Sequence, residues 1–446
     1  MNVSIIGSGY VGTTVAACLA DLGHDVVNVE IDEEIVETIN AGEAPIHESG
    51  LAERIADHAG TRLRATTEYD AVRETDVTFL CLPTPQTDDG GLDLAIMEAG
   101  SESLGRALAE KDGDHLVVVK STVLPGTTED VVGPILEAES GTEIGDGLEL
   151  AMNPEFLRMG TAVQDFLEPD KVVFGTASDG AATTLRELYA PILDREAQRA
   201  SNNTSGGEPR AREETDLVET DIREAELIKY ANNAFLASKV SLVNELGNIA
   251  REYDADAYEV LEAVGLDDRI SERFMRSGLG WGGSCFPKDV NALRAGAREQ
   301  GYDPDLLDAV VAVNDEQPRR LVDLLADHVS LDGARIAVLG LSFKPGTDDI
   351  RKSRALDVIE YLTERGADVV AYDPVAIENV RPDYPDIEYA DSVESALAGA
   401  DGAVVATDWP EFDDVSFEDM TCSVVVDGRR IDVDKDALHV YEGLTW

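Results

Sequence analysis

The chain has 446 residues, 43% of them hydrophobic, and carries 90 acidic and 36 basic residues for a formal net charge of −54. The length and apolar fraction predict a globular protein of roughly three domains, and the charge argues against binding to nucleic acid or anionic membranes. The carboxylates are spread along the whole chain, so they repel one another in dilute buffer and are screened near 1 M salt, where the Debye length is about 3 Å. We therefore expect a protein of a salt-rich cytoplasm.

The sequence contains no run of about 18 apolar residues, so we expect no transmembrane helix. The pattern of a strand begins at residue 2, with no basic segment before it. This argues against a signal peptide. Four scattered cysteines, Cys18, Cys81, Cys285 and Cys422, lack the spacing of a metal site. A reduced, metal-free protein of the cytoplasm is the expectation.

The first elements in the chain predict a dinucleotide-binding unit. Residues 2–6 form a predicted strand, Gly7-Ser8-Gly9-Tyr10-Val11-Gly12 a glycine turn, residues 13–22 a helix, and residues 24–31 a second strand. Glycines in such a turn let the backbone approach a pyrophosphate, which the helix N-terminus then faces.

An acidic residue at the end of the second strand completes this fingerprint. Glu30 is the better candidate to bind the adenosine ribose hydroxyls, and Asp32 the weaker one. A carboxylate there would repel a 2′-phosphate, so Glu30 favours NAD over NADP.

Three further strands end in polar segments. Residues 76–82, 116–120 and 148–152 are followed by Pro83-Thr84-Pro85, Ser121-Thr122-Val123 and Asn153-Pro154-Glu155-Phe156-Leu157. Ligands of a doubly wound sheet sit at the carboxyl ends of its strands, so each segment is a candidate site.

The chain beyond these strands predicts a loop, a long helix and a second α/β domain. Residues 196–222 are polar and charged and contain Gly206-Gly207, as in a surface insertion or loop. Apolar residues at three- and four-residue spacing predict a helix over 224–253. Lys229 and Asn233 lie one turn apart on it. Strands from residue 335 onward lack the glycine fingerprint, so the second unit is expected to bind something other than a dinucleotide.

Cys285 lies in the segment Gly282-Gly283-Ser284-Cys285-Phe286-Pro287-Lys288-Asp289. The glycines leave the thiol accessible, Lys288 favours the nucleophilic thiolate, and Asp289 could orient the chemistry. An inert cysteine in a glycine-rich loop is the alternative. Cys18 and Cys81 are expected to be packed in the core.

Together these motifs resemble the UDP-glucose 6-dehydrogenase family, within the wider UDP-glucose/GDP-mannose dehydrogenases. The resemblance spans nearly the whole chain and rests on Gly7–Gly12, Pro45–Glu48, Ser121–Val123, Asn153–Leu157, Glu226–Phe235, Gly282–Asp289, Phe343-Lys344 and Asp427-Gly428-Arg429.

The resemblance implies two Rossmann-like doubly wound domains joined by a central helical domain with a long spine helix. The implied division is 1–195 for NAD, 196–222 for the loop, 223–325 for the helical domain with the cysteine loop, and 326–446 for the nucleotide sugar. It also implies oxidation of the sugar C6 alcohol to a carboxylate with two NAD⁺, and a homo-oligomer with a dimer through the long helix.

Residue roles follow from the same resemblance. Cys285 would capture the aldehyde as a thiohemiacetal that is oxidised to a thioester. Lys229, or a water held by Asp289, would be the base; Lys229 and Asn233 would stabilise the oxyanion; Glu155 and Thr122 would bind the hydrolytic water. Implied cofactor contacts are Gly7, Gly9, Tyr10, Val11, Gly12, Glu30, Thr84, Thr122, Lys288 and Arg351. Implied substrate contacts are Glu155, Phe156, Leu157, Lys229, Asn233, Arg269 (from a second subunit), Phe274, Gly282, Phe286, Phe343, Lys344 and Arg429.

One position departs from the family. A second glutamate commonly follows the one matching Glu155 by four residues, and this chain has Met159 there. The rival interpretation is a GDP-mannose or UDP-N-acetylhexosamine 6-dehydrogenase. By the same resemblance, these enzymes share the cysteine, lysine, asparagine and aspartate. Phe286 and the loop Phe274–Trp281 favour UDP-glucose. A nucleotide-sugar epimerase would need a Tyr-x-x-x-Lys pair, and the sequence has no convincing counterpart. A non-catalytic sensor on the same scaffold would be expected to lose Cys285 or Lys229, and both are present.

Overall fold

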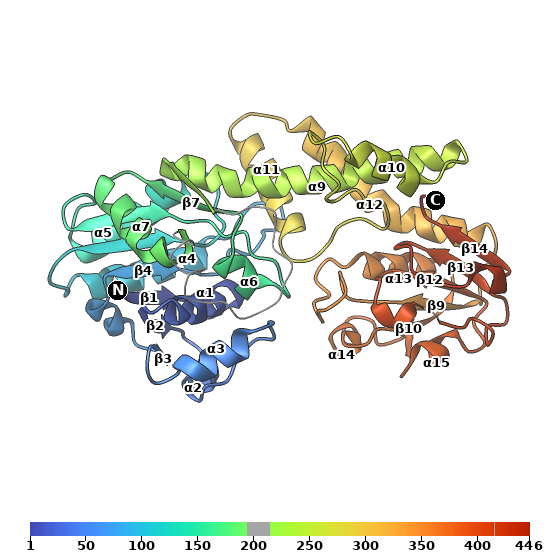
Figure 1. Ribbon diagram of the computed structural model, residues 1–446, viewed down its shortest axis with the longest axis horizontal. Coiled ribbons are helices and arrows are strands. Elements are labelled where there is room, and N and C mark those ends of the chain that lie inside the picture. Colours follow the sequence, from blue (N-terminus) through green and yellow to red (C-terminus); the bar gives the residue numbers. More distant parts are fainter. Residues whose placement is uncertain (194–214, 414) are drawn as a thin grey trace. The chain divides into compact units, whose positions relative to one another are not determined.

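The computed structural model describes residues 1–193, 215–413 and 415–446. These residues divide into two compact units, Met1–Ala231 and Asn232–Trp446. Each unit contains a parallel-rich sheet with helices packed on it (Figure 1). The predicted α/β fold class is confirmed, and the helical segment after Asn232 groups with the second sheet.

The first unit is built on an eight-stranded sheet of order β3-β2-β1-β4-β5-β6-β7-β8. All neighbours are parallel except β6 and β7, which pair antiparallel. The strands are β1 (Asn2–Ile6), β2 (Asp25–Val29), β3 (Leu63–Thr66), β4 (Val77–Leu80), β5 (His115–Val119), β6 (Leu148–Met152), β7 (Lys171–Thr176) and β8 (Asp216–Thr220). The strands predicted from the sequence agree to within two residues at each end.

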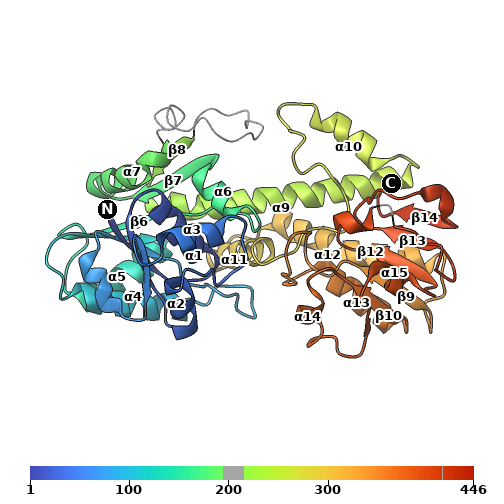
Figure 2. The same cartoon turned by 60° about the horizontal axis from the view of Figure 1, so that its bottom comes forward.

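Helices cover both faces of this sheet. They are α1 (Tyr10–Asp21), α2 (Glu33–Asn40), α3 (Leu51–His58), α4 (Ala95–Leu108), α5 (Gly133–Ser140), α6 (Ala162–Leu167) and α7 (Asp179–Leu193), with short turns η1 (Tyr69–Glu74) and η2 (Thr128–Val132). One core cluster joins α1, α3, α6 and α7 to the strands, and the other joins α4, α5 and the start of α9 (Ile222–Glu252). The helices α4 and α5 lie side by side (Figure 2). The strands are buried from both sides, which explains runs such as Leu116-Val117-Val118-Val119.

The loop predicted over 196–222 needs a correction where it is described. Residues 196–214 lie outside the described part of the chain, but Asp216–Thr220 forms β8 and pairs in parallel with β7. The strand was missed because its alternation is short and it lies at the edge of the sheet, where Leu217, Val218 and Thr220 are half-buried and no residue of the strand is fully buried. Helix α9 begins two residues earlier than predicted, at Ile222.

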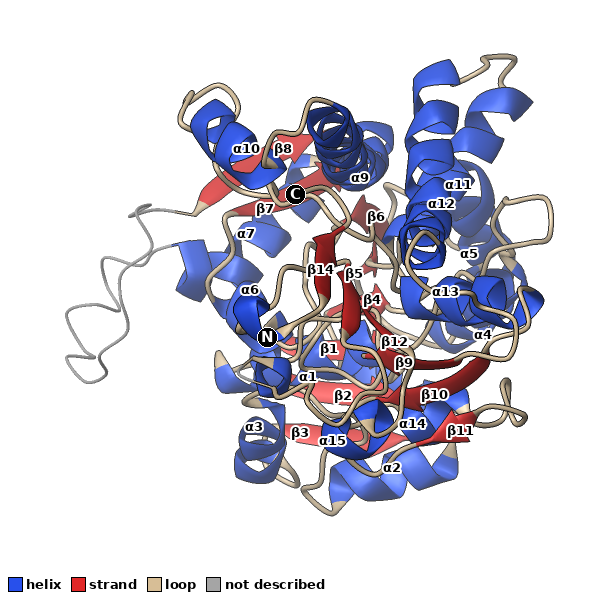
Figure 3. Ribbon diagram, turned by 90° about the vertical axis from the view of Figure 1, so that its right-hand side faces the viewer, coloured by secondary structure: helices blue, strands red, loops and turns tan. Residues whose placement is uncertain are grey.

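The second unit contains a six-stranded parallel sheet of order β11-β10-β9-β12-β13-β14, drawn in red in Figure 3. Its strands are β9 (Arg335–Leu339), β10 (Asp368–Tyr372), β11 (Glu388–Tyr389), β12 (Gly402–Val405), β13 (Val424–Asp427) and β14 (Val440–Gly443). Helices α12 (Asp305–Ala326) and α13 (Arg354–Glu364) pack on one face and α15 (Val393–Leu397) on the other. The remaining elements are α10 (Ala257–Gly265), α11 (Phe286–Glu299), α14 (Ile377–Val380), η3 (Pro410–Phe412) and η4 (Lys435–Ala437).

Helix α9 is continuous over 31 residues, or about 46 Å at 1.5 Å per residue. It begins in the first unit and ends in the second. Among the described residues, no helix is long and apolar enough to cross a membrane, and no group of three or more His, Cys, Asp or Glu side chains is arranged to hold a metal ion.

Candidate active site

The glycine turn between β1 and α1 has no room for side chains. Gly7 has φ +97°, and a Cβ there would lie 2.6 Å from the Cys81 carbonyl oxygen. A Cβ on Gly12 would lie 1.9 Å from the Gly7 oxygen, whereas Gly9 borders open space. No side chain caps α1 at Gly9, and its first turn contains no acidic residue. The helix N-terminus is therefore free to face an anion in a chain that is otherwise strongly acidic.

The Glu30 carboxylate follows β2 and reaches this turn. Its Oε2 accepts a hydrogen bond from the Ser8 backbone N–H at 2.7 Å, and its Oε1 accepts one from Ile31 N–H at 2.8 Å. Asp32 instead caps α2 by accepting the Glu34 N–H at 2.9 Å. The geometry thus fits Glu30, and not Asp32, as the ribose ligand of a dinucleotide. The Tyr10 hydroxyl accepts the Gly160 N–H at 3.1 Å, and Val11 packs against the core.

The carboxyl ends of β4, β5 and β6 bring three predicted segments to one edge of the first sheet. The Thr84 hydroxyl donates to the Thr122 carbonyl oxygen at 3.0 Å, which ties the segment after β4 to the one after β5. Below them, the buried Lys120 ammonium donates to Asn153 Oδ1 at 2.8 Å. Burial lowers the pKa of Lys120 to about 8.

Lys229 and Glu155 form a buried ion pair. Lys229 Nζ lies 2.8 Å from Glu155 Oε1, and the two side chains are 5% and 9% exposed. Burial by itself would raise the pKa of Glu155, but the Lys229 ammonium and the Leu157 N–H together lower it. Phe156 lies between cations, with its ring centroid 4.2 Å from Lys171 Nζ and 5.5 Å from Lys229 Nζ. Glu155 is therefore held as a carboxylate, at the strand end where the sequence predicted it.

In the second unit, Cys285 is exposed and occupies the N-cap position of α11. One turn later, the Asp289 N–H donates to the Cys285 carbonyl oxygen at 2.8 Å. A helix N-terminus and the lysine of its first turn both favour a thiolate. Cys18 and Cys81 are buried, as expected, and burial raises the pKa of each thiol to about 12. The two core cysteines are inert by comparison.

The Asp289 carboxylate is almost fully buried between an amide and an ammonium group. Asn233 Nδ2 donates to its Oδ2 at 2.6 Å. Lys288 Nζ lies 2.8 Å from Oδ1, but the angles of this ion pair are not those of a hydrogen bond. The structure thus brings Asn233, Lys288 and Asp289 together beside the cysteine.

The cysteine loop packs against the segment between β9 and α13. A Cβ on Gly282 would lie 2.1 Å from the Lys352 carbonyl oxygen, and one on Gly283 would lie 2.9 Å from the Phe343 ring. Lys344 Nζ lies 5.5 Å from the Phe343 ring centroid. Arg351 forms a bidentate ion pair with Asp349, with a shortest contact of 2.7 Å. This hydrogen bond raises the pKa of Arg351, and the nearby Cys285 thiol raises it further.

Other predicted substrate residues are spread over the second unit. Arg429 Nε donates to the Ala406 carbonyl oxygen at 2.8 Å, and burial lowers the pKa of this arginine. Phe286 packs edge-on against Trp281 with ring centroids 6.3 Å apart. Phe274 is about half exposed and has φ +62°. Arg269 is exposed and pairs with Asp267, its neighbour in the chain, at 2.6 Å.

Three buried amides that the sequence analysis missed fix the loop before Cys285. Asn244 on α9 accepts the Gly278 N–H at 2.9 Å, and Gln317 on α12 donates to the Gly278 carbonyl oxygen at 2.7 Å. Asn314 exchanges two hydrogen bonds with the Trp281 backbone. The only sign of these residues in the sequence was a polar amide among the apolar residues of a helix. The sequence does not show whether such an amide is buried, so it cannot be told apart from an ordinary solvent-exposed residue.

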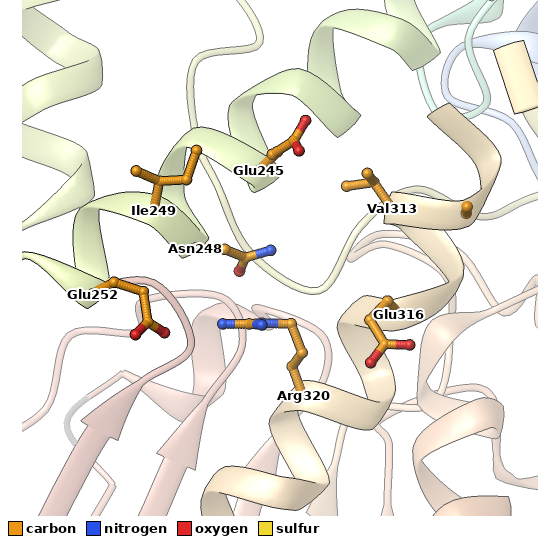
Figure 4. A pocket seen from close by; sticks show the side chains of 8 residues that line it. Glu245, Asn248, Ile249, Glu252, Val313, Glu316 and Arg320 are labelled. Atoms are coloured by element: carbon orange, nitrogen blue, oxygen red, sulfur yellow. The ribbon is translucent and has the colours of Figure 1, made fainter. Parts of the chain in front are cut away.

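A hollow of about 510 Å³ lies between α9 and α12 in the second unit, and none of the predicted site residues lines it (Figure 4). It is lined by Glu245, Asn248, Ile249, Glu252, Ala312, Val313, Glu316 and Arg320. Three glutamates around one arginine would repel the diphosphate of a sugar nucleotide, so this hollow is not the substrate site.

The doubly wound sheets, the glycine turn with Glu30 and the exposed cysteine together define a dinucleotide-dependent dehydrogenase. Models of the UDP-glucose/GDP-mannose dehydrogenase family match three segments: the NAD binding domain at residues 1–193, the central domain at 223–316 and the UDP binding domain at 337–433. The chain belongs to this family, and its cofactor is NAD.

Known relatives agree with this assignment. The chain is 59% identical to UDP-glucose 6-dehydrogenase AglM of Haloferax volcanii, with all of both chains covered. The structure of a UDP-glucose dehydrogenase from the hyperthermophilic archaeon Pyrobaculum islandicum matches with TM-score 0.90 and 39% identity over 100% of this chain and 98% of that one. The UDP-D-ManNAc dehydrogenase of Pyrococcus horikoshii matches with TM-score 0.84 and 28% identity over 100% and 99%.

Proposed function

We propose that this protein oxidises the C6 alcohol of UDP-glucose to the carboxylate of UDP-glucuronate, using two NAD⁺. The observation that carries the proposal is the exposed Cys285 at the start of α11, with Asp289 and Asn233 hydrogen-bonded one turn beyond it. An alcohol dehydrogenase that stops at the aldehyde needs no nucleophile, whereas a four-electron oxidation gains from covalent capture of the aldehyde. The full-length likeness to proteins named UDP-glucose dehydrogenases supports the choice of sugar.

The first half of the reaction converts the alcohol to an aldehyde. The glycine turn and Glu30 would hold NAD⁺, with further contacts from Tyr10, Val11, Thr84, Thr122, Lys288 and Arg351; when bound, this cofactor would supply the hydride acceptor. Lys229 is an ammonium paired with Glu155, so it donates a hydrogen bond to the C6 oxygen. The hydroxyl proton then passes to a water held by Asp289. Asn233 is the second donor to the oxygen.

The second half converts the aldehyde to the acid. The Cys285 thiolate adds to the aldehyde carbon and gives a thiohemiacetal oxyanion, which hydrogen bonds from Lys229 and Asn233 stabilise. Removal of a hydride from this carbon leaves a thioester on Cys285; a second NAD⁺, bound by the same residues, would supply the hydride acceptor. Water, oriented by Glu155 and Thr122, attacks the thioester carbon and releases the carboxylate and the thiolate. With Met159 in place of a second glutamate, hydrolysis rests on Glu155, Asp289 and water in this proposal.

We assign the sugar nucleotide to cations and aromatic rings of the second unit. Lys344 and Arg429 would balance the charge of the diphosphate, which matters in a chain of net charge −54. Phe274, Phe286, Phe343 and Gly282 would line the sugar and base, together with Phe156 and Leu157 of the first unit. We keep the division into an NAD domain (1–195), a central helical domain (223–325) and a nucleotide-sugar domain (326–446) as part of this proposal, and place the protein in the cytoplasm.

The proposal is tested by NADH production at about 2 M KCl, with UDP-glucose, GDP-mannose and UDP-N-acetylhexosamines offered separately. We expect two NADH per UDP-glucose consumed and no turnover of the others. Two NADH from UDP-N-acetylmannosamine alone would keep the mechanism and move the substrate to that of the Pyrococcus neighbour. A folded protein that produces NADH from none of them would refute the proposal.

We also propose a homodimer through α9. Phe235, Leu242, Leu246, Ile249 and Tyr253 are exposed and recur at spacings of seven, four, three and four, which aligns them in one apolar stripe. A second copy of the same helix offers the matching stripe, and Arg269 would then reach the substrate of the partner subunit. Sedimentation at 2 M KCl should give a dimer for the wild type and a monomer for Leu246→Glu; a monomeric wild type would contradict the proposal.

A further inference from the structure

Glu226 has a fully buried carboxylate on the second turn of α9. Its Oε2 accepts the Gly126 N–H at 2.6 Å, and its Oε1 accepts the Thr128 N–H at 2.8 Å. Burial raises the pKa of this carboxyl, and the two amides counteract the rise. A buried acid whose two oxygens both bind backbone N–H groups of another segment is placed to fix that segment.

The segment is the turn after β5, which contains Thr122. Gly126 and Thr128 lie at its far end, where the helical turn η2 begins at Thr128, after the N-cap residue Thr127, and continues into α5. The first N–H groups of a helix have no partner within it, and a carboxylate is the favoured acceptor there. Glu226 therefore caps this helix from a different element.

The near end of the same turn is fixed independently. The Ser121 hydroxyl donates to the Leu82 carbonyl oxygen at 2.6 Å, and the Thr84 hydroxyl donates to the Thr122 carbonyl oxygen at 3.0 Å. Val123 is fully buried in the core. With Glu226 holding the other end, Thr122 sits on a turn that is held on both sides.

Glu226 and Lys229 are three residues apart on α9, so they share a face of the helix. Lys229 binds Glu155, which follows β6, while Glu226 binds the turn that follows β5. Adjacent turns of one helix thus hold the two strand-end segments that carry Thr122 and Glu155.

We propose that Glu226 is a positioning residue for thioester hydrolysis: it fixes the Thr122 turn to α9, so that Thr122 and Glu155 orient the same water. This inference rests on the proposed function. Glu226 itself does not touch the substrate; it acts through the two backbone amides.

The test is Glu226→Gln, which keeps the size of the side chain but turns one acceptor into a donor facing a backbone N–H. We expect kcat for acid formation to fall about 10- to 100-fold, as for a small misplacement of catalytic groups, with KM for the sugar nucleotide unchanged. Because hydrolysis is the step affected, mass spectrometry should find the thioester accumulating on Cys285. Glu226→Asp keeps the charge and both oxygens and should recover part of kcat.

Arg223→Gln is the matched control. Arg223 lies one turn earlier on α9 and ties the same helix to η2 through Glu129 and Asp130, both at 2.8 Å, but on the exposed surface. It should leave kcat near the wild-type value. If kcat falls equally in both variants, Glu226 only holds α9 in place as Arg223 does, and the inference is wrong. The inference is also wrong if Glu226→Gln has the wild-type kcat and accumulates no thioester.

Two further measurements separate this inference from the proposed function. The NADH yield of the wild type tests the function by itself. Hydrogen exchange at Gly126 and Thr128 tests the clamp without turnover: faster exchange in Glu226→Gln than in Arg223→Gln supports it, and equal rates overturn it. If Glu226→Gln does not fold, Glu226→Asp takes its place in both comparisons.

Discussion

Replacing Cys285 by serine is expected to stop turnover to the acid, with a loss of about three orders of magnitude or more in kcat, in the range seen when a covalent nucleophile is removed. Cys285 is exposed at the N-cap of α11, so the thiolate is both accessible and electrostatically favoured. A serine hydroxyl is not ionised at neutral pH and adds poorly to the aldehyde. Any ester that does form should hydrolyse slowly and remain on the enzyme, where mass spectrometry of the Ser-containing peptide would detect it.

Cys422→Ser is the matched control for this variant. Cys422 lies in the second unit and is half-buried beside the core of the second sheet, without a role in the proposed chemistry. Its loss should leave kcat unchanged. Full production of UDP-glucuronate by Cys285→Ser would refute the covalent mechanism, whatever the substrate.

Molar KCl is expected to raise both the melting temperature and the activity. With 90 acidic and 36 basic residues, most carboxylates have no cation of their own, and even paired arginines are shared: Arg73 contacts both Asp70 and Glu110. The Debye length falls from about 10 Å at 0.1 M to about 3 Å at 1 M, which removes repulsion between neighbouring carboxylates. Relief of several kcal/mol corresponds to a rise in Tm of about 10 °C for a unit of some 200 residues.

The control is betaine at the same osmolarity, because it is excluded from protein surfaces but leaves the Debye length unchanged. Calorimetry and NADH production at 0.1, 0.5, 1 and 2 M KCl should both increase with salt, and betaine should reproduce only part of the increase. Maximal activity near 0.1 M KCl would contradict the screening argument.

The local pattern of the sequence already determined much of the first unit. The glycine turn, the strands β1, β2, β4, β5 and β6, and α9 to within two residues at its ends follow from steric rules and from periodicity, which act between residues close in the chain. The strands β3 and β7 were not predicted. The same logic predicted Glu30, and not Asp32, as the ribose ligand; in the structure, Asp32 caps α2. The loop predicted over 196–222 was wrong at β8, because an edge strand with only two half-buried apolar residues, Leu217 and Val218, has too weak a pattern.

The tertiary structure alone decided which polar side chains are buried and what they bind. Lys229 pairs with Glu155 across 74 positions of the chain, and Glu226 reaches amides about 100 positions away. Asn244, Asn314 and Gln317 hold the cysteine loop from two helices. A sequence shows that a helix contains a carboxylate or an amide. The group that this side chain binds depends on the order in which the strands pair in the sheet, which local patterns do not determine. Burial then makes that partner obligatory, because an unpaired charge in the interior costs several kcal/mol.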